Sequence, residues 1–389
     1  MKSRIVAVTI ALLALLSPCF SRAADAARQA FASAMQAMQA GDFARAEAGF
    51  RRVLQLDPGN VGALADLGIV YSRTHRYTEA IDEYKKVLRL MPDQPETELN
   101  IGLAYLKQDD YANALPWFRK LHHEDPANQK ITMLLATSLT FSGDPKSGIA
   151  LLKPLTQVRG GNPAALYLLG VASARAGQAE QAKQVFARLF SDAATLAQTD
   201  FLLGKAYADA TDYPAAEQAF QSALQADSSF AGAHRELGKA YLGAHRNTDA
   251  EKELRIAVTD DVSDGDAWYY LGAMLVQSGR YDAGLPCLRK AQSLLPDSWA
   301  VYFYMGKAEL LLDHIPTAVP LLQNATRLNP DDTGSYYLLA RAFRSEGHAE
   351  EAAAALERVA ALHNSALDVE RRALTDAGIV KNAGITDQP

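Results

Sequence analysis

The sequence predicts an all-α solenoid built from about ten helix-turn-helix repeats. Three observations carry this prediction. A frame of 34 residues recurs without insertion or deletion from residue 27 to residue 366. Two positions of the frame hold only glycine or alanine, and a third holds only large apolar residues. Glycine and proline recur at the positions where helices must turn or stop.

The frame divides the chain into ten repeats, which begin at residues 27, 61, 95, 129, 163, 197, 231, 265, 299 and 333. The blocks 61–94 and 95–128 show the pattern most plainly. Both have Leu or Ile before Gly at positions 7 and 8, Tyr at positions 11 and 17, Ala at position 20 and Pro at position 32. Units that recur at this period bury their apolar faces on their neighbours rather than in one central core.

The small residues at positions 8 and 20 and the large residue at position 24 predict two closely crossing helices in each repeat. Position 24 is always large and apolar, from Phe50 in the first repeat to Leu356 in the last. Helices that approach closely need small side chains at the crossing and a large one beside it. We therefore expect a bulky residue at Gly204 to cost about 1–3 kcal/mol through overpacking.

Turn residues predict the ends of these helices. Position 15 is glycine in five repeats, which favours a left-handed turn between the two helices. Position 32 is proline in five repeats, which ends the second helix. Pro116, Pro286 and Pro320 fall at position 22, where the lost hydrogen bond would run to the first residues of the helix, so we expect a mild kink rather than a break.

The pattern resembles the tetratricopeptide repeat (TPR) family over residues 27–366, and Trp268-x-x-Leu271-Gly272 carries its signature almost unchanged. The resemblance implies a right-handed α-α superhelix whose first helices line a concave groove. The repeat at 129–162 departs most from the pattern, and we expect it to stack loosely as a hinge. Beyond residue 366, we expect one capping helix over 367–380 and a frayed tail, together spanning 367–389.

Residues 1–23 predict a removable secretory leader. Lys2 and Arg4 precede a twelve-residue apolar run, and small residues lead to Ala23. The run is shorter than the ~20 residues of a membrane-spanning helix. The alternatives are cleavage at Ala26, retention as an anchor, and a lipid-modified Cys19. Cleavage after Ala23 removes three cations and changes the formal charge of −6 to −9.

Composition and space argue against several function classes. The acidic balance disfavours nucleic acid as a partner. The leader and the repeats leave 23 residues, too few for a catalytic domain, so we predict no enzyme, catalytic residue, metal or cofactor. His122, His123 and Glu124 are adjacent and could bind a metal, but such a trio is more often a solvated helix end.

In proteins of this family, positions 2, 5, 9, 12 and 13 tend to face the groove. Here those positions carry eleven basic and three acidic residues. In the later repeats, aromatic rings at position 5 stand beside cations at position 9, an arrangement that suits an extended peptide with acidic side chains or a free carboxylate. The predicted groove residues are Tyr167, Arg175, Phe201, Lys205, Arg235, Lys239, Tyr269, Phe303, Lys307, Tyr337, Arg341 and Arg344. The alternative is that the cations pair with neighbours such as Glu236 and only solubilise the surface.

The sequence thus predicts an exported, non-enzymatic scaffold that binds a protein or peptide in the periplasm or outside the cell, in assembly or secretion of envelope components. The asparagines of the family's carboxylate clamp (position 9) and of its sugar-transferase ladder (position 6) are absent as sets. The second hypothesis is a polysaccharide-binding or polysaccharide-export protein that uses Tyr269, Tyr270, Phe303 and Tyr304 as stacking surfaces.

Overall fold

The computed structural model of the chain describes residues 24–157, 162–190 and 195–376, with side chains as far as residue 364. The predicted leader over residues 1–23, with its alternative lipid anchor, lies outside the described residues, as does the tail over 377–389. Within the described ranges, no helix combines the length and the apolar character that crossing a membrane requires.

The chain forms two compact units, which divide between Ala176 and Gly177. In the first unit residues 24–39 are helical. The helices that follow are α2 (Phe43–Leu56), α3 (Val61–Arg73), α4 (Tyr77–Leu90), α5 (Pro95–Leu106), α6 (Tyr111–Glu124), α7 (Gln129–Phe141), α8 (Pro145–Thr156) and α9 (Pro163–Arg175).

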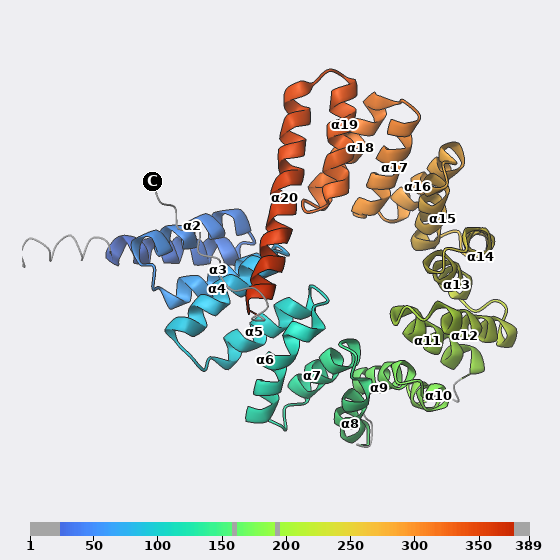
Figure 1. The fold of residues 1–389 in the computed structure, drawn as a ribbon, viewed down its shortest axis with the longest axis horizontal. Coiled ribbons are helices and arrows are strands. Elements are labelled where there is room, and N and C mark those ends of the chain that lie inside the picture. The colour runs from blue at the N-terminus through green and yellow to red at the C-terminus, as the bar shows by residue number, and fades with distance from the viewer. Residues whose placement is uncertain (1–23, 158–161, 191–194, 377–389) are drawn as a thin grey trace, which may run out of the picture. The chain divides into compact units, whose positions relative to one another are not determined.

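The second unit continues the same alternation of helices and short turns (Figure 1). Its helices are α10 (Ala179–Ala187), α11 (Leu196–Asp209), α12 (Tyr213–Ala226), α13 (Ala233–Gly243), α14 (Asn247–Asp260), α15 (Gly265–Gln277), α16 (Tyr281–Leu294), α17 (Trp299–Leu311), α18 (Ile315–Leu328), α19 (Thr333–Ser345) and α20 (Ala349–Asp376). Every regular element among the described residues is helical. Consecutive helices pack on one another within each unit, which confirms the predicted all-α solenoid.

Side-chain caps begin many of these helices at the same place in the frame. At position 16, just before the second helix, Asp42, Asp110, Asp144 and Asp212 each accept a hydrogen bond from the backbone N–H three residues later. At position 34, Asn60 and Asp264 cap α3 and α15 in the same way. Such caps satisfy N–H groups that have no partner inside the helix.

The small-residue columns lie where the two helices of a repeat cross. A Cβ atom added to Gly204 would lie 2.6 Å from Cδ1 of Phe220, and one added to Gly102 would lie 2.7 Å from Cε1 of Phe118. Both rings are fully buried. The ring at position 24 therefore fills the space that glycine leaves at position 8, as the sequence predicts.

The turn at position 15 is left-handed in every repeat. The five glycines there, such as Gly279, have positive φ angles, which confirms the predicted conformation. The other five repeats adopt the same conformation with side chains at His75, Asp109, Thr211, His245 and Asp313, whose φ angles lie between 55° and 64°. The turn geometry is therefore set by the helix pair, and glycine only makes it easier.

Prolines inside second helices do not interrupt them. α6 contains Pro116, α16 contains Pro286 and α18 contains Pro320, and each helix continues past its proline. This agrees with the expectation that no break occurs at position 22.

Two features differ from the sequence-based expectations. α20 is a single helix of 28 residues, so residues 367–376 extend the last second helix instead of starting a separate capping helix. Position 32 of that repeat is Asn364 rather than proline, and no proline or glycine follows before Gly378 to stop the helix. The second difference concerns the hinge that we expect in the fourth repeat. The two units divide inside the fifth repeat instead, and α7 and α8 of the fourth repeat pack closely around Gly148.

At three junctions between repeats, an arginine at position 16 pairs with a glutamate 29 residues earlier. Arg76 lies 2.9 Å from Glu47, Arg246 lies 2.7 Å from Glu217 and Arg280 lies 2.7 Å from Glu251. Each pair is partly exposed, so each contributes little to stability. At these three junctions the pair links the second helix of one repeat to the start of the second helix of the next.

Candidate functional site

The predicted groove residues fall in both compact units. Tyr167 and Arg175 lie on α9 in the first unit. Arg175 Nε donates a hydrogen bond to the carbonyl oxygen of Thr140 over 3.2 Å, and its guanidinium carbon lies 4.8 Å from the ring centroid of Phe141. The Arg175 side chain therefore holds α9 against α7.

The other ten predicted residues lie on five first helices of the second unit and form what we call the second-unit strip. It consists of Phe201, Lys205, Arg235, Lys239, Tyr269, Phe303, Lys307, Tyr337, Arg341 and Arg344. The five helices, α11, α13, α15, α17 and α19, contact one another in that order. Positions 5, 9 and 12 of a helix share one face, so the strip runs across contacting helices.

At the α11 end of the strip, Phe201 is a packing residue. Its ring centroid lies 5.8 Å from that of Phe220 and 5.1 Å from that of Phe230. Lys205 is half-buried, with Nζ 6.0 Å from the Phe201 ring centroid. Among the described residues, Lys205 has no carboxylate partner within ion-pair distance.

A chain of aromatic rings covers α15 and α17. The ring centroids of Tyr269 and Tyr270 are 5.0 Å apart, those of Tyr269 and Tyr304 are 6.0 Å apart, and Phe303 lies 5.1 Å from Tyr304. Burial raises the pKa of Tyr269 well above its ordinary value, so its hydroxyl stays protonated at neutral pH. These distances are typical of favourable aromatic pairs.

Cations border this ring chain, one from the neighbouring first helix α13 and one on α17 itself. Lys239 Nζ on α13 lies 5.3 Å from the Tyr270 ring centroid, and Lys307 Nζ on α17 lies 5.9 Å from that of Tyr304. Both distances permit a cation–π attraction. These rings stand at position 6 of the frame rather than at the predicted position 5, and only Lys205 lies by a position-5 ring, that of Phe201.

On α13, however, the cations are neutralised by neighbouring carboxylates. Arg235 Nη1 lies 2.5 Å from Asp264 Oδ2, and its Nε donates to Glu236 Oε1 over 3.1 Å. Lys239 Nζ donates to the other carboxylate oxygen of Glu236 over 2.8 Å. Two cations and two anions balance here, so the alternative of structural pairing with Glu236 describes this part of the strip.

At the α17–α19 end the cations have no such partners. Arg341 and Arg344 are exposed on α19, and Lys307 is half-buried on α17. No described carboxylate lies within ion-pair distance of these three side chains. Tyr337, which precedes Arg341 by one turn, is 58% exposed.

Sequence reasoning missed Asp264, the last residue of the same repeat, which binds Arg235 from its place just before α15. Asp264 also caps α15, where its other carboxylate oxygen accepts from the N–H of Ala267 over 2.9 Å. A capping aspartate at position 34 is visible in the sequence. Its second partner depends on how the repeats stack, which no single repeat shows.

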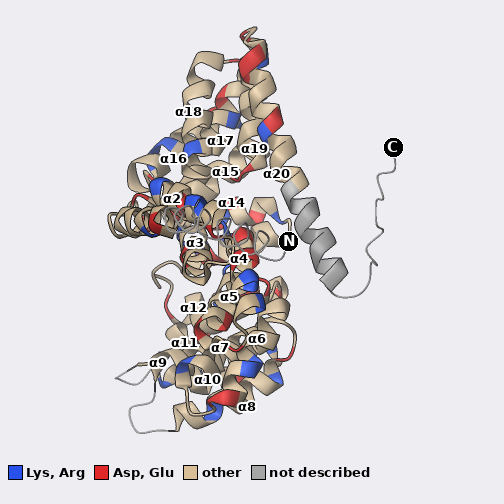
Figure 2. Ribbon diagram, turned by 90° about the vertical axis from the view of Figure 1, so that its left-hand side faces the viewer, with Lys and Arg blue, Asp and Glu red and all other residues tan. Residues whose placement is uncertain are grey.

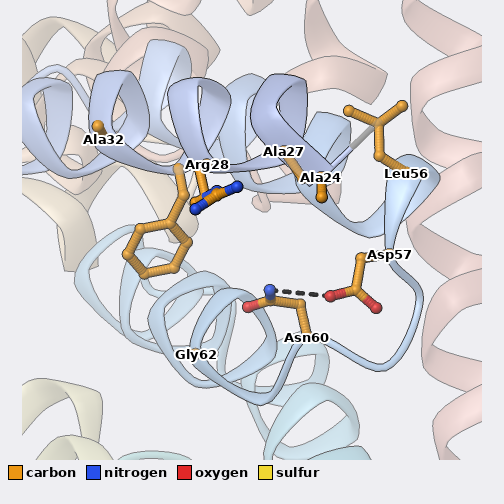
Figure 3. A pocket seen from close by; sticks show the side chains of 9 residues that line it. Ala24, Ala27, Arg28, Ala32, Leu56, Asp57, Asn60 and Gly62 are labelled. Carbon is orange, nitrogen blue, oxygen red and sulfur yellow. Dashed lines mark hydrogen bonds between the residues drawn. The ribbon is translucent and has the colours of Figure 1, made fainter. Parts of the chain in front are cut away.

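A separate cavity of about 640 Å³ lies near the start of the first unit (Figure 3). Arg28 lies on one side of it and the hydrogen-bonded pair of Asp57 and Asn60 on the other. The Arg28 guanidinium already contacts Asp25 over 2.7 Å. Alanines and Phe31 supply most of the remaining lining, so the cavity offers little directed polar chemistry.

Charged residues elsewhere are mixed in sign, and Figure 2 shows Lys and Arg beside Asp and Glu on helices of both units. In the parts of the chain that the structure describes, no group of three or more His, Cys, Asp or Glu side chains is placed to hold a metal ion. His122 instead faces the Thr132 hydroxyl, with 3.2 Å between Nδ1 and Oγ1.

Comparison with known families agrees with this architecture. Family models described as tetratricopeptide repeat match residues 37–98, 201–244, 235–298 and 303–367, which together exceed half of the chain. A model described as anaphase-promoting complex, cyclosome, subunit 3 matches residues 107–189. A search of curated proteins finds no match to this chain.

Solved structures of similar fold share little sequence with the chain. MamA 41-end from Desulfovibrio magneticus RS-1 is 16% identical, with a TM-score of 0.41, over 44% of this chain and 96% of that one. YrrB, described as a TPR protein with an unusual peptide-binding site, is 20% identical, with a TM-score of 0.39, over 44% and 91%. Naa15/Naa10 bound to HypK-THB is 14% identical, with a TM-score of 0.38, over 88% and 64%. From the repeat matches and the helix-turn-helix architecture together, the chain belongs to the tetratricopeptide repeat family, whose members are scaffolds for binding proteins or peptides.

Proposed function

We propose that this protein is an exported, non-enzymatic scaffold that binds an extended protein segment on the second-unit strip, in the assembly or secretion of envelope components. The observation that carries the proposal is the continuous run of rings and cations on five contacting first helices. Aromatic faces accept apolar side chains and backbone, and the lysines and arginines attract carboxylates. A flexible acidic segment satisfies both kinds of group.

Export is proposed from the leader, which the fold does not address. We expect the mature chain to begin at Ala24, after removal of Lys2, Arg4 and Arg22. Fractionation of the source cells followed by amino-terminal sequencing measures this. A chain recovered from the cytoplasm with Lys2 still present contradicts the export proposal. A lipid found on Cys19 would instead show that the exported protein is anchored to a membrane.

Selection from a random peptide library on the purified full-length chain tests the binding function. We expect the recovered peptides to be rich in Asp and Glu and to contain at least one apolar or aromatic residue. Their affinity should fall clearly as salt rises from 0.05 to 0.5 M, because screening shortens the reach of exposed charges. Recovery of no acidic peptides contradicts the proposal.

The polysaccharide hypothesis keeps one observation in its favour, the ring chain formed by Tyr269, Tyr270, Phe303 and Tyr304. Stacking of sugar rings on such a surface is largely insensitive to salt. Binding to neutral oligosaccharides at equal affinity in low and high salt, with loss on replacement of Tyr304, supports the polysaccharide hypothesis and argues against peptide binding.

A further inference from the structure

The cations of the second-unit strip differ in what already binds them, and this difference divides the strip into two parts. The α13 part contains Arg235 and Lys239, whose charged groups contact Glu236 and Asp264 at 2.5–3.1 Å. Glu236 is 7% exposed. A carboxylate arriving from a partner would have to displace a carboxylate that is already buried and bonded to both cations.

The α17–α19 part has the opposite character. We call Lys307, Arg341 and Arg344 the cationic corner. Arg341 and Arg344 are three residues apart and therefore share a face of α19. Lys307 on α17 occupies position 9 of its repeat, as Arg341 does on α19, and these two first helices contact each other.

Two carboxylates close in sequence to the cationic corner are engaged by histidines instead. Glu309 on α17 is 6% exposed, and the ring of His314 contacts it over 2.9 Å. Glu346, just after α19, faces His348 over 3.5 Å. The corner is thus a site of concentrated positive charge whose described surroundings leave its side chains available to an incoming anion.

Aromatic side chains border the cationic corner. Tyr304 lies beside Lys307, with Nζ 5.9 Å from its ring centroid. Its hydroxyl accepts a hydrogen bond from Gln277 Nε2, which fixes the ring position. Tyr337 projects into solvent one turn before Arg341. Rings beside open cations suit a chain that carries both carboxylates and apolar groups.

We propose that the cationic corner receives the carboxylates of an extended acidic peptide, whereas Arg235 and Lys239 are structural cations that hold α13 to the residue before α15. This inference rests on the proposed function and assigns a location and a charge to the partner's contact. The apolar side chains of the same peptide lie toward the ring chain on α15 and α17. The strip thereby binds its partner with a defined polarity.

Binding of a fluorescein-labelled, N-acetylated hexaglutamate peptide to the full-length chain, followed by fluorescence anisotropy, tests the location. Replacing Lys307→Gln together with Arg341→Gln should weaken binding at least about tenfold, since two charge-assisted contacts are lost. The charge-conserving pair Lys307→Arg with Arg341→Lys should stay within about threefold of the parent.

The matched control removes the same charge from second helices. Lys252 on α14 and Lys290 on α16 are exposed, and Lys252→Gln with Lys290→Gln should change the affinity less than about twofold at 0.15 M salt, where the Debye length is about 8 Å. Unchanged circular dichroism verifies that both double variants remain folded.

Three outcomes overturn the inference. Equal weakening by the corner variant and by the control shows a general charge effect. Weakening only when Lys205 or Lys239 is replaced places the carboxylates at the other end of the strip and leaves the proposed function standing. Failure of hexaglutamate to bind the parent chain also overturns the inference, and the library selection then decides separately whether the proposed function survives.

Discussion

Replacing Gly284 by alanine should destabilise the eighth repeat, and Val276 is the neighbour that it would crowd most. Gly284 stands at position 20 of its repeat, and a Cβ atom added there would lie 2.8 Å from Cγ2 of Val276 and 3.0 Å from the carbonyl oxygen of Gly272. Val276 is 1% exposed and cannot turn away into solvent. Overpacking of this kind costs about 1–3 kcal/mol, against which alanine gains about 0.5–1 kcal/mol of helix propensity over glycine. The net expectation is a loss of up to about 2 kcal/mol.

The same substitution should change sign once the neighbour is trimmed. In six other repeats an alanine at position 20 faces a glycine at position 8, so the backbone has room for the methyl group. Glycine replaces it only where position 12 is β-branched, at Thr140 beside Gly148 and at Val276 beside Gly284. In a Val276→Ala background, Gly284→Ala should therefore stabilise by about 0.5–1 kcal/mol.

Amide hydrogen exchange of α15 and α16 measures this local free energy, which is appropriate for a solenoid whose repeats open separately. The single variants and the double variant complete a thermodynamic cycle. Ala250→Gly, at position 20 of the seventh repeat, provides the control in which alanine is already accommodated; it should lose about 0.5–1 kcal/mol of helix propensity and, because Ala250 is fully buried, about 0.8 kcal/mol for the methyl group. Equal effects of Gly284→Ala in the two backgrounds would refute the packing argument.

Two further predictions concern the turns and the links between repeats. Thr211 has a φ angle of 58°. This left-handed backbone costs a residue with a side chain about 1–2 kcal/mol, whereas glycine loses about 0.5–1 kcal/mol in conformational entropy. Thr211→Gly should therefore raise the free energy of unfolding in urea by about 0.5 kcal/mol, and a decrease would contradict the strain argument. The hydrogen bond from Arg280 lowers the pKa of Glu251 below its ordinary value of 4.5, so this stabilisation is present at pH 7 and is lost as the pH falls through the lowered pKa. The difference in unfolding free energy between the parent and Glu251→Gln should therefore be at most about 1 kcal/mol at pH 7 and should shrink below pH 4. A difference that stays constant between pH 7 and pH 3 would show that the charge of Glu251 does not stabilise the fold.

The repeat frame could be predicted from the sequence because each position repeats the same physical demand. Each helix crossing requires glycine or alanine at position 8 and an aromatic residue or leucine at position 24, and the requirement recurs in all ten repeats, which makes the pattern visible. The left-handed turns at His75 and Thr211 could not be inferred from residue type, because those residues disfavour the conformation that the helix pair imposes.

The division of the second-unit strip also lay beyond the sequence. Arg235 at position 5 and Lys307 at position 9 both appear as cations at groove positions, and their residue types do not say which of them is already paired. Their difference arises because Asp264, just before α15, reaches back to Arg235 on α13, while Glu309 beside Lys307 is engaged by His314. Such choices depend on side-chain geometry between stacked helices rather than on residue spacing.

Amide hydrogen exchange of the full-length chain with and without the hexaglutamate peptide tests the central claim most directly. The account predicts added protection in α17 and α19 (residues 299–311 and 333–345), with α13 little changed. Protection confined to α11 and α13, or to helices of the first unit, would contradict it.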